Sequence, residues 1–212
     1  SAQKSPTMRV TTTWRWHRSH FRSGRYAEFH RPQGAGDLFA RRSVYAATQL
    51  NHAMHTPVMR IDIWSDVVCP WCWIGKRRFE QAVATLGERL PALEIHYHAF
   101  QLDPDSGLQP VPLREALLPK FGSAERTEQL LAQTQQTARA EGLPFDFSRG
   151  QVQVTTLPAH RLIWLAAREG DVEPVIEALF HAHFAEGKNL AAADTLIAAG
   201  AAGGLAPARV QA

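Results

Sequence analysis

The stretch IDIWSDVVCPWCWIGKRRFE, residues 61–80, holds the only two cysteines of the 212-residue chain. Apolar Ile61 and Ile63 alternate with Asp62 and Trp64, which predicts a strand, and apolar residues at helical spacing predict a helix over residues 69–86. An alternating, aromatic-rich run over residues 94–100 predicts a second strand. A strand, a helix and a strand in this order make a βαβ unit, whose helix crosses over between two parallel strands.

The two cysteines are separated by Pro70 and Trp71. Proline is favoured at the first helical position, so Cys69 is expected at the N-cap, where its sulfur faces free N–H groups and the positive end of the helix dipole. That environment favours a thiolate and lowers the pKa of the thiol below its usual value of about 8.5. Cys72 lies about one turn further on and is less open to solvent. This arrangement predicts thiol–disulfide exchange, with Cys69 as nucleophile and Cys72 as resolving thiol.

Two other interpretations of the pair remain open. It could be two inert core cysteines, or part of a metal site, which would need further ligands at suitable spacing. The chain has no third cysteine, and its histidine candidates are the pairs His96/His98 and His181/His183, two residues apart, and the lone His160. We therefore expect no metal.

The neighbours of the cysteines are weaker candidates. Pro70 and Trp71 lie between the cysteines and are candidates for tuning the redox potential of the pair or for contacting substrate; Trp71 offers apolar surface to a docked peptide, although it could also simply pack on the surface. Asp66, three residues before the first cysteine, could relay a proton to the buried thiol or could shape the loop. Lys76 and Arg77 are expected on a solvated face.

Three further residues are expected in the core: a hydrogen-bonded His183 on an apolar stripe of its helix, Phe100 and Trp164. Residues after 110 change to helical patterns. Ser123 and Asp171 are good N-caps, Pro158 lies near a helix start, and a weak Ala-rich helix is expected over residues 191–201.

The net charge of +3 is the sum of a basic N-terminal segment and an acidic remainder. Residues 1–58 contain nine Lys/Arg and two Asp/Glu, whereas the remainder contains 14 Lys/Arg and 18 Asp/Glu. The first segment lacks a sustained apolar period, which predicts a disordered basic extension without an identifiable function. A nucleic-acid-binding arm and a transit peptide are the alternatives, although we expect no nucleic-acid partner.

From residue 60 onward the sequence closely resembles the DsbA-like thioredoxin-fold oxidoreductases, particularly the FrnE type. The resemblance begins at SDVVCPWCWIGKRRFE and continues through FQLDP, KFGSAER, EGLPFDF, TTLPAHRL and EALFHAHFAEGKNL. It implies an α/β thioredoxin fold with an inserted all-helical domain, the nucleophile at Cys69 and the resolving thiol at Cys72. The related 2-hydroxychromene-2-carboxylate isomerases, which use glutathione, usually carry serine at the position of Cys69.

Thioredoxin folds normally continue after such an insert with two more strands, a helix and a cis-proline loop that faces the cysteines. No matching pattern follows the helices here, so the C-terminal part of the fold is expected to be truncated. The expected domains are residues 1–58, a basic extension; 59–110, the βαβ unit; and 111–212, the helical insertion. An open strand edge predicts marginal stability and weak turnover.

The sequence therefore predicts an enzyme that exchanges disulfides with protein or small-molecule thiols, with no cofactor beyond its own dithiol and with glutathione as a candidate partner. A glutathione-dependent isomerase and a non-catalytic peptide-binding holdase are the alternatives. No apolar run is long enough to span a membrane, and no secretory signal is present, so a reducing, cytoplasmic setting is expected.

Overall fold

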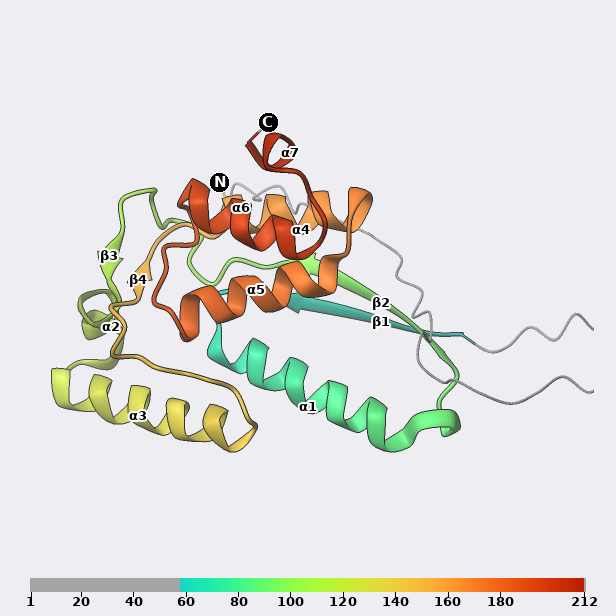
Figure 1. Cartoon of the computed structure of the whole chain (residues 1–212). Helices are drawn as coiled ribbons and strands as arrows, with labels where there is room; N and C mark the ends of the chain where they lie inside the picture. Colours follow the sequence, from blue (N-terminus) through green and yellow to red (C-terminus); the bar gives the residue numbers. More distant parts are fainter. Residues whose placement is uncertain (1–57, 212) are drawn as a thin grey trace, which may run out of the picture.

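The computed structural model describes residues 58–211. It opens with strand β1 (Val58–Ser65), helix α1 (Pro70–Leu86), the short 3-10 helix η1 (Gly87–Arg89) and strand β2 (Ala92–Ala99). β1 and β2 pair in parallel, as Figure 1 shows, so the predicted βαβ unit is confirmed. The predictions for residues 1–57 lie outside the described part of the chain.

The two faces of this sheet follow the alternation in the sequence. Ile61 pairs with Ile95 and Ile63 with Tyr97, and the hydroxyl of Tyr97 donates to Glu173 on helix α5 (Val172–Phe184). The opposite face carries the polar and aromatic residues Asp62, Trp64, His96 and His98. Within residues 58–211, β1 and β2 pair only with each other, and the remaining β-structure is a separate two-residue pair, β3 (Val111–Pro112) with β4 (Val152–Gln153).

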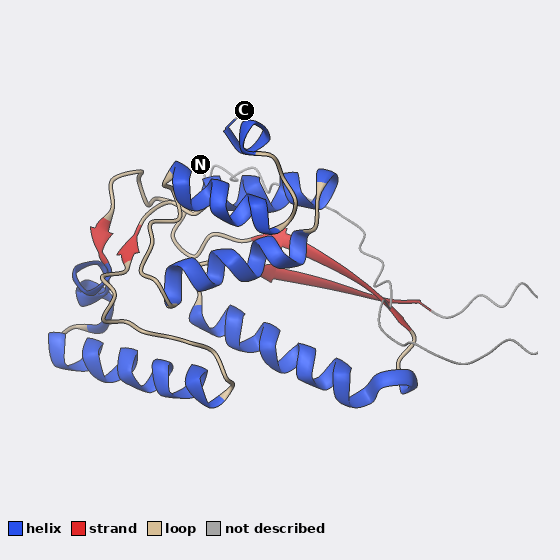
Figure 2. Cartoon of the chain, in the orientation of Figure 1, coloured by secondary structure: helices blue, strands red, loops and turns tan. Residues whose placement is uncertain are grey.

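Helices make up most of the rest of the described chain (Figure 2). They are α2 (Leu113–Phe121), α3 (Ala124–Ala140), α4 (Leu157–Glu169), α5 (Val172–Phe184), α6 (Ala193–Ala202) and α7 (Pro207–Gln211). The predicted caps are confirmed: the Ser123 hydroxyl accepts from the Arg126 N–H at 3.2 Å, and the Asp171 carboxylate accepts from the Glu173 N–H at 3.2 Å. In Figure 1, α5 lies between α1 below and α4 and α6 above, which places it at the centre of the molecule.

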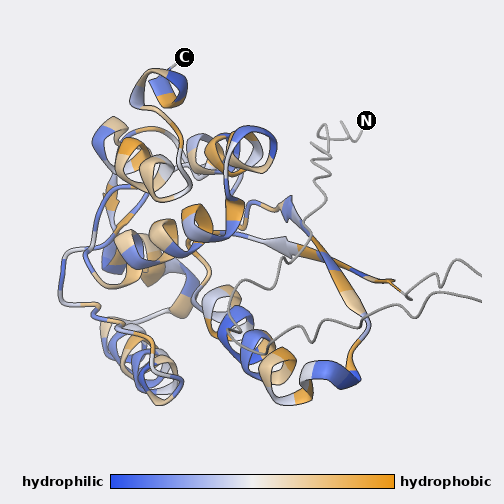
Figure 3. Ribbon diagram, turned by 45° about the vertical axis from the view of Figure 1, so that its right-hand side comes forward, coloured by the Kyte–Doolittle hydropathy of each residue, from blue (hydrophilic) through white to orange (hydrophobic). Residues whose placement is uncertain are grey.

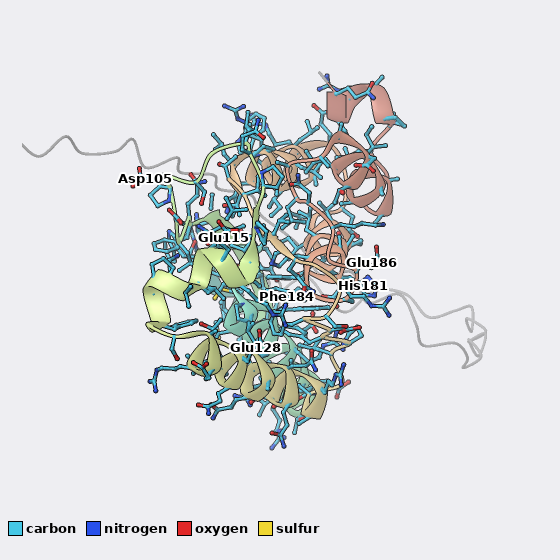
Figure 4. The ribbon with its side chains drawn as sticks, turned by 90° about the vertical axis from the view of Figure 1, so that its left-hand side faces the viewer. Asp105, Glu115, Glu128, His181, Phe184 and Glu186 are labelled. Carbon is cyan, nitrogen blue, oxygen red and sulfur yellow. The ribbon has the colours of Figure 1, made fainter. Side chains whose placement is uncertain are left out.

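The main core is formed by aromatic side chains between α1 and α5. Trp73 stacks on Phe145, Phe180 and Phe184, with ring centroids 5.2, 5.7 and 6.0 Å away. Phe184 lies in the interior in Figure 4, whereas His181 and Glu186 lie at the outer edge. Figure 3 shows hydrophobic residues on the strands, on α1 and on the other helices, and a hydrophilic turn after the end of α1. The helices are therefore packed directly onto the helix that carries the cysteines.

Two of the residues expected in the core lie elsewhere. Phe100 is 52% exposed, because β2 ends at Ala99 and the chain leaves the sheet there. Trp164 is only partly buried on α4, where the Arg168 guanidinium lies 4.4 Å above its ring. His183 is buried as predicted, but within residues 58–211 its Nδ1 has no hydrogen-bond partner.

The solvated face predicted for Lys76 and Arg77 is also wrong. Lys76 is buried, and its Nζ lies 3.1 Å from Glu173 and 3.3 Å from Glu177, both on α5, and also contacts Glu80. The Arg77 guanidinium pairs with Glu177 at 2.9 Å. The error arose because these residues meet acidic side chains about a hundred positions away along the chain. They connect α1 to α5 through charge as well as through the aromatic core.

Replacing Lys76 with methionine is therefore expected to lower the free energy of unfolding by about 2 kcal/mol, because three carboxylates would remain together without their shared cation. Urea denaturation would measure the change. The matched control is Arg78→Met: the Arg78 pair with Glu141 is exposed, so a loss within about 0.5 kcal/mol is expected. Equal losses in the two variants would contradict a stabilising role for the buried cation.

Candidate redox site

Cys69 is the N-cap residue of α1, as the sequence predicts. Its backbone is extended (φ −89°, ψ 112°), and Pro70 begins the helix. The Cys69 N–H donates to the Asp66 carbonyl at 3.0 Å, and the Cys69 carbonyl accepts from the Cys72 N–H at 3.1 Å. These two bonds hold Cys69 at the start of the helix, at the end where α1 presents its unpaired N–H groups.

Both cysteines are free thiols and are partly buried. Cys72 also packs against the hydrophobic core, next to residues of the helices. Since Cys69 occupies the cap and Cys72 lies against the core, a large disulfide substrate has the shorter approach to Cys69. The two cysteines thus differ in their surroundings.

The two thiols influence each other's pKa. The Cys69 thiol donates a hydrogen bond to the Cys72 sulfur, which lowers the pKa of Cys72 to about 6, and the same bond and burial raise the pKa of Cys69. The Asp66 N–H and the Ser65 hydroxyl also favour the Cys72 thiolate. The sequence prediction of a lowered pKa at Cys69 is therefore wrong: backbone N–H groups of Trp71 and Cys72 favour the Cys69 thiolate, but the hydrogen bond to Cys72 and burial outweigh them. The pair therefore loses its first proton at a lower pH than an isolated thiol and its second proton at a higher one.

Asp66 is almost completely buried, at 1% exposure. One carboxylate oxygen accepts from the Leu102 N–H at 2.8 Å, which ties the loop before α1 to the loop after β2. The other lies 3.2 Å from Nε2 of His160. The loop-shaping role considered for Asp66 is thus visible in the structure, and its carboxylate still has a titratable partner.

Among residues 58–211, no cluster of three or more histidine, cysteine or acidic side chains has an arrangement that could hold a metal ion. None of the helices in this range is both long and apolar enough to cross a bilayer.

The geometry of a CPWC pair at a helix N-terminus agrees with the comparisons to known proteins. A family model described as the DSBA-like thioredoxin domain matches residues 60–212. The chain belongs to the DSBA-like thioredoxin domain family. A solved structure described as a probable DsbA oxidoreductase from Streptomyces coelicolor is similar, with 32% identity and a TM-score of 0.67. The match covers 72% of this chain and 66% of that one, so this DsbA-like chain spans slightly less than two thirds of that protein. No curated protein matches.

The family confirms the predicted DsbA-like resemblance and fold class and supports thiol–disulfide oxidoreductase chemistry in general. The FrnE type and the proposed domain boundaries stay predictions. Of the predicted site residues, Asp66 and Cys69 lie in the loop before α1, and Pro70, Trp71 and Cys72 lie in its first turn, where Trp71 is 55% exposed. That exposure leaves both interpretations of Trp71 open.

Sequence reasoning missed His160 in this DsbA-like site, because it considered the residue only as a lone metal ligand. The structure places His160 on α4, buried and beside Asp66, 94 positions earlier in the chain. A signal was present: His160 lies on the same buried helix face as Ala159 and Leu162. A buried polar side chain on an apolar face requires a polar partner.

Proposed function

We propose that the chain is a FrnE-type thiol–disulfide oxidoreductase that exchanges disulfides with protein or small-molecule thiols through Cys69 and Cys72. The observation that supports this most directly is the pair of free thiols at the N-terminus of α1, where the side chain of Cys69 lowers the pKa of Cys72. Such a pair holds one thiolate at neutral pH, and the thiolate is the attacking species in disulfide exchange.

The proposed reaction has two steps. In the first, the Cys69 sulfur attacks a substrate disulfide, forms a mixed disulfide and releases one substrate thiolate. In the second, the Cys72 sulfur attacks the Cys69 sulfur, the Cys69–substrate bond breaks, and the second substrate thiolate leaves. The protein is then oxidised to an internal disulfide and the substrate has gained two electrons. The reverse sequence oxidises a substrate dithiol, and the redox poise of the surroundings decides the direction.

The remaining parts of the proposal concern partners and setting. The exposed ring of Trp71 is a suitable contact for apolar substrate residues, and Pro70 holds the helix start. The chemistry needs no cofactor beyond the dithiol, and glutathione or another protein thiol can return the pair to its starting state. A reducing, cytoplasmic location suits this role.

The test uses an aromatic disulfide that releases a coloured thiol. The reduced wild-type chain is expected to release two coloured thiols per molecule and to end with a Cys69–Cys72 disulfide. Cys72→Ser is expected to release one and to retain the other as a mixed disulfide on Cys69, detected by mass spectrometry. Cys69→Ser is expected to react at least about 100-fold more slowly, because the remaining thiol packs against the core.

The control is the wild-type chain in denaturant, which has the same thiols without the helix. Its reaction at pH 6 should be far slower than that of the folded chain. Equal rates for Cys69→Ser and the wild type would contradict Cys69 as nucleophile. Isomerase activity on a chromene carboxylate, or peptide holding, that persists without either thiol would favour the alternative functions.

A further inference from the structure

The outer edge of strand β1 has no strand paired with it within residues 58–211. In that range β1 pairs only with β2, and the pairing is regular over all eight residues of β1. No residue of β1 is buried, whereas β2 has three buried residues. In Figure 1 the first residues of β1 lie beyond the ends of α4, α5 and α6. A long, regular edge without proline is a template for pairing with another strand.

The backbone groups at this edge belong to alternate residues of β1. The Ser65 carbonyl accepts from the Phe100 N–H at 3.2 Å, so the backbone groups of Ser65 point toward β2. Backbone groups of successive strand residues point to opposite edges, and those of Arg60, Asp62 and Trp64 therefore point away from β2. A further strand must form its hydrogen bonds with these residues.

The sequence of β1, VMRIDIWS, is complementary to itself when two copies run antiparallel about Ile61. With Ile61 opposite Ile61 of a second copy, Arg60 lies opposite Asp62 of that copy, and Asp62 lies opposite its Arg60. Opposite charges at directly facing positions stabilise an antiparallel pair. A two-fold axis produces each contact twice, as in the interface of a homodimer.

The apolar residues on either side of the charges match as well. In the same register Val58 lies opposite Trp64 of the second copy, and Met59 lies opposite its Ile63. Val58, Met59 and Trp64 are 58%, 44% and 60% exposed in the single chain. The Trp64 ring is also held in place by stacking on His98 of β2, with ring centroids 4.4 Å apart. Pairing would therefore cover the large apolar side chains that β1 leaves in solvent.

Other registers fit the edge less well. A two-fold axis at Arg60 or at Asp62 would place like charges opposite each other, which is destabilising. A shift by one residue would set backbone groups that face the edge opposite groups that face β2, so a regular ladder could not form. An axis further along the strand would pair fewer residues. The register about Ile61 is thus the one that satisfies backbone and side chains together.

We propose that a second copy of this chain pairs with β1 along this edge, antiparallel about Ile61. The two chains then share a four-stranded sheet in the order β2–β1–β1–β2. Because side chains alternate along a strand, Ile61 and Ile63 of both copies lie on one face of the joined sheet. The cysteine loop follows Ser65 at the end of β1, so the two dithiols lie at opposite ends of the antiparallel pair, and the interface does not involve them.

Sedimentation equilibrium of the reduced full chain tests the association. The wild type is expected to form a dimer that dissociates on dilution. Arg60→Asp places like charges opposite each other twice and is expected to raise the dissociation constant at least about 10-fold. The matched control is Arg209→Asp: its arginine is about as exposed and is also ion-paired, with Glu169, but it lies on α7, so the dissociation constant is expected to stay unchanged.

A mixture of two variants separates pairing across the axis from effects within one chain. Asp62→Arg chains are also expected to dissociate, because they place arginines opposite each other. Mixing Arg60→Asp chains with Asp62→Arg chains restores opposite charges at both facing positions, so the mixture is expected to dimerise again. A mixture that stays monomeric would contradict the charge pairing between copies.

The register is tested by disulfide trapping in a Cys69→Ser/Cys72→Ser chain, which has no other thiol. Ile61 of the two copies would face each other as a non-hydrogen-bonded pair with Cα atoms about 4.5 Å apart, within the range that a disulfide spans. Oxidation is therefore expected to link Ile61→Cys chains. Ile63→Cys is the control, since its two copies would be four residues apart, about 13 Å, and no link is expected.

Three results would overturn the proposal and leave the oxidoreductase function untouched. The first is a wild-type monomer at every concentration, whether its own chain or solvent covers the edge. The second is a dimer whose dissociation constant is the same in Arg60→Asp, which would place the interface elsewhere. The third is a link that forms in Ile63→Cys but not in Ile61→Cys chains, which would require another register.

Discussion

Replacing Trp73 with alanine is expected to lower the free energy of unfolding by about 3–5 kcal/mol, the usual cost of truncating a buried aromatic side chain. Trp73 is 1% exposed and stacks on three phenylalanine rings that come from the helical part of the chain. Its Nε1–H also donates to Glu177 on α5 at 3.1 Å. Alanine would leave a cavity between α1 and α5 and would remove that hydrogen bond.

The sequence offers a matched control two positions away. Trp71 is the same residue type on the same helix, but it is 55% exposed, so Trp71→Ala should change the free energy of unfolding by no more than about 0.5 kcal/mol. Trp73→Phe keeps a ring in the core and loses the bond to Glu177, for an expected cost of about 1–2 kcal/mol. Urea denaturation would measure all three, and the dependence of the free energy of unfolding on urea concentration should keep the same slope. Similar losses for the two tryptophan-to-alanine variants would contradict the packing described here.

The βαβ unit and the helix ends could be predicted because their signals are local. Ile61 and Ile63 define a strand face by simple alternation, and Pro70 fixes the helix start within one residue. Ser123 and Asp171 act as caps through bonds that span only two or three residues. Each of these features depends on near neighbours in the chain, so no knowledge of the tertiary arrangement was needed.

For the same reason, only those parts of the candidate site that depend on neighbours in the sequence could be predicted. The CPWC pair lies within one helical turn, but the partners of Asp66 come from Leu102 and His160, 36 and 94 positions away. Likewise, Lys76 looked like a surface residue because its acidic partners belong to α5. The sequence alone does not show whether a helix or loop far along the chain will place a hydrogen-bond or ion-pair partner next to a polar residue.

The sequence predicts a lowered pKa at Cys69, whereas in the structure it is the pKa of Cys72 that is lowered. In the reduced chain, the pKa of Cys72 is lowered to about 6 by the Cys69 thiol, so alkylation of the pair should rise as the pH increases through about 6. Below that pH both sulfurs carry protons and react slowly. Above it one thiolate is present, while the second proton remains because the pKa of Cys69 is raised.

Cys72→Ala is expected to move the onset of alkylation at Cys69 up to about the ordinary thiol value of 8.5. The remaining thiol still receives N–H groups from the helix, but it is partly buried and has no neighbouring sulfur to share a proton with. At pH 6 its thiolate fraction, and hence its alkylation rate, should be on the order of 100-fold below that of the pair. Mass spectrometry after timed alkylation across the pH range would give the titration of each cysteine.

Cys72→Ser is the matched variant, because its hydroxyl can donate a hydrogen bond to a Cys69 thiolate where alanine cannot. The expected order of the first thiol pKa is therefore wild type, then Cys72→Ser, then Cys72→Ala as the highest. A value near 6 for Cys69 in Cys72→Ala would show that the start of α1 lowers the pKa by itself, as the sequence alone predicts. It would also mean that the two sulfurs titrate separately, because removing one would not have changed the proton affinity of the other.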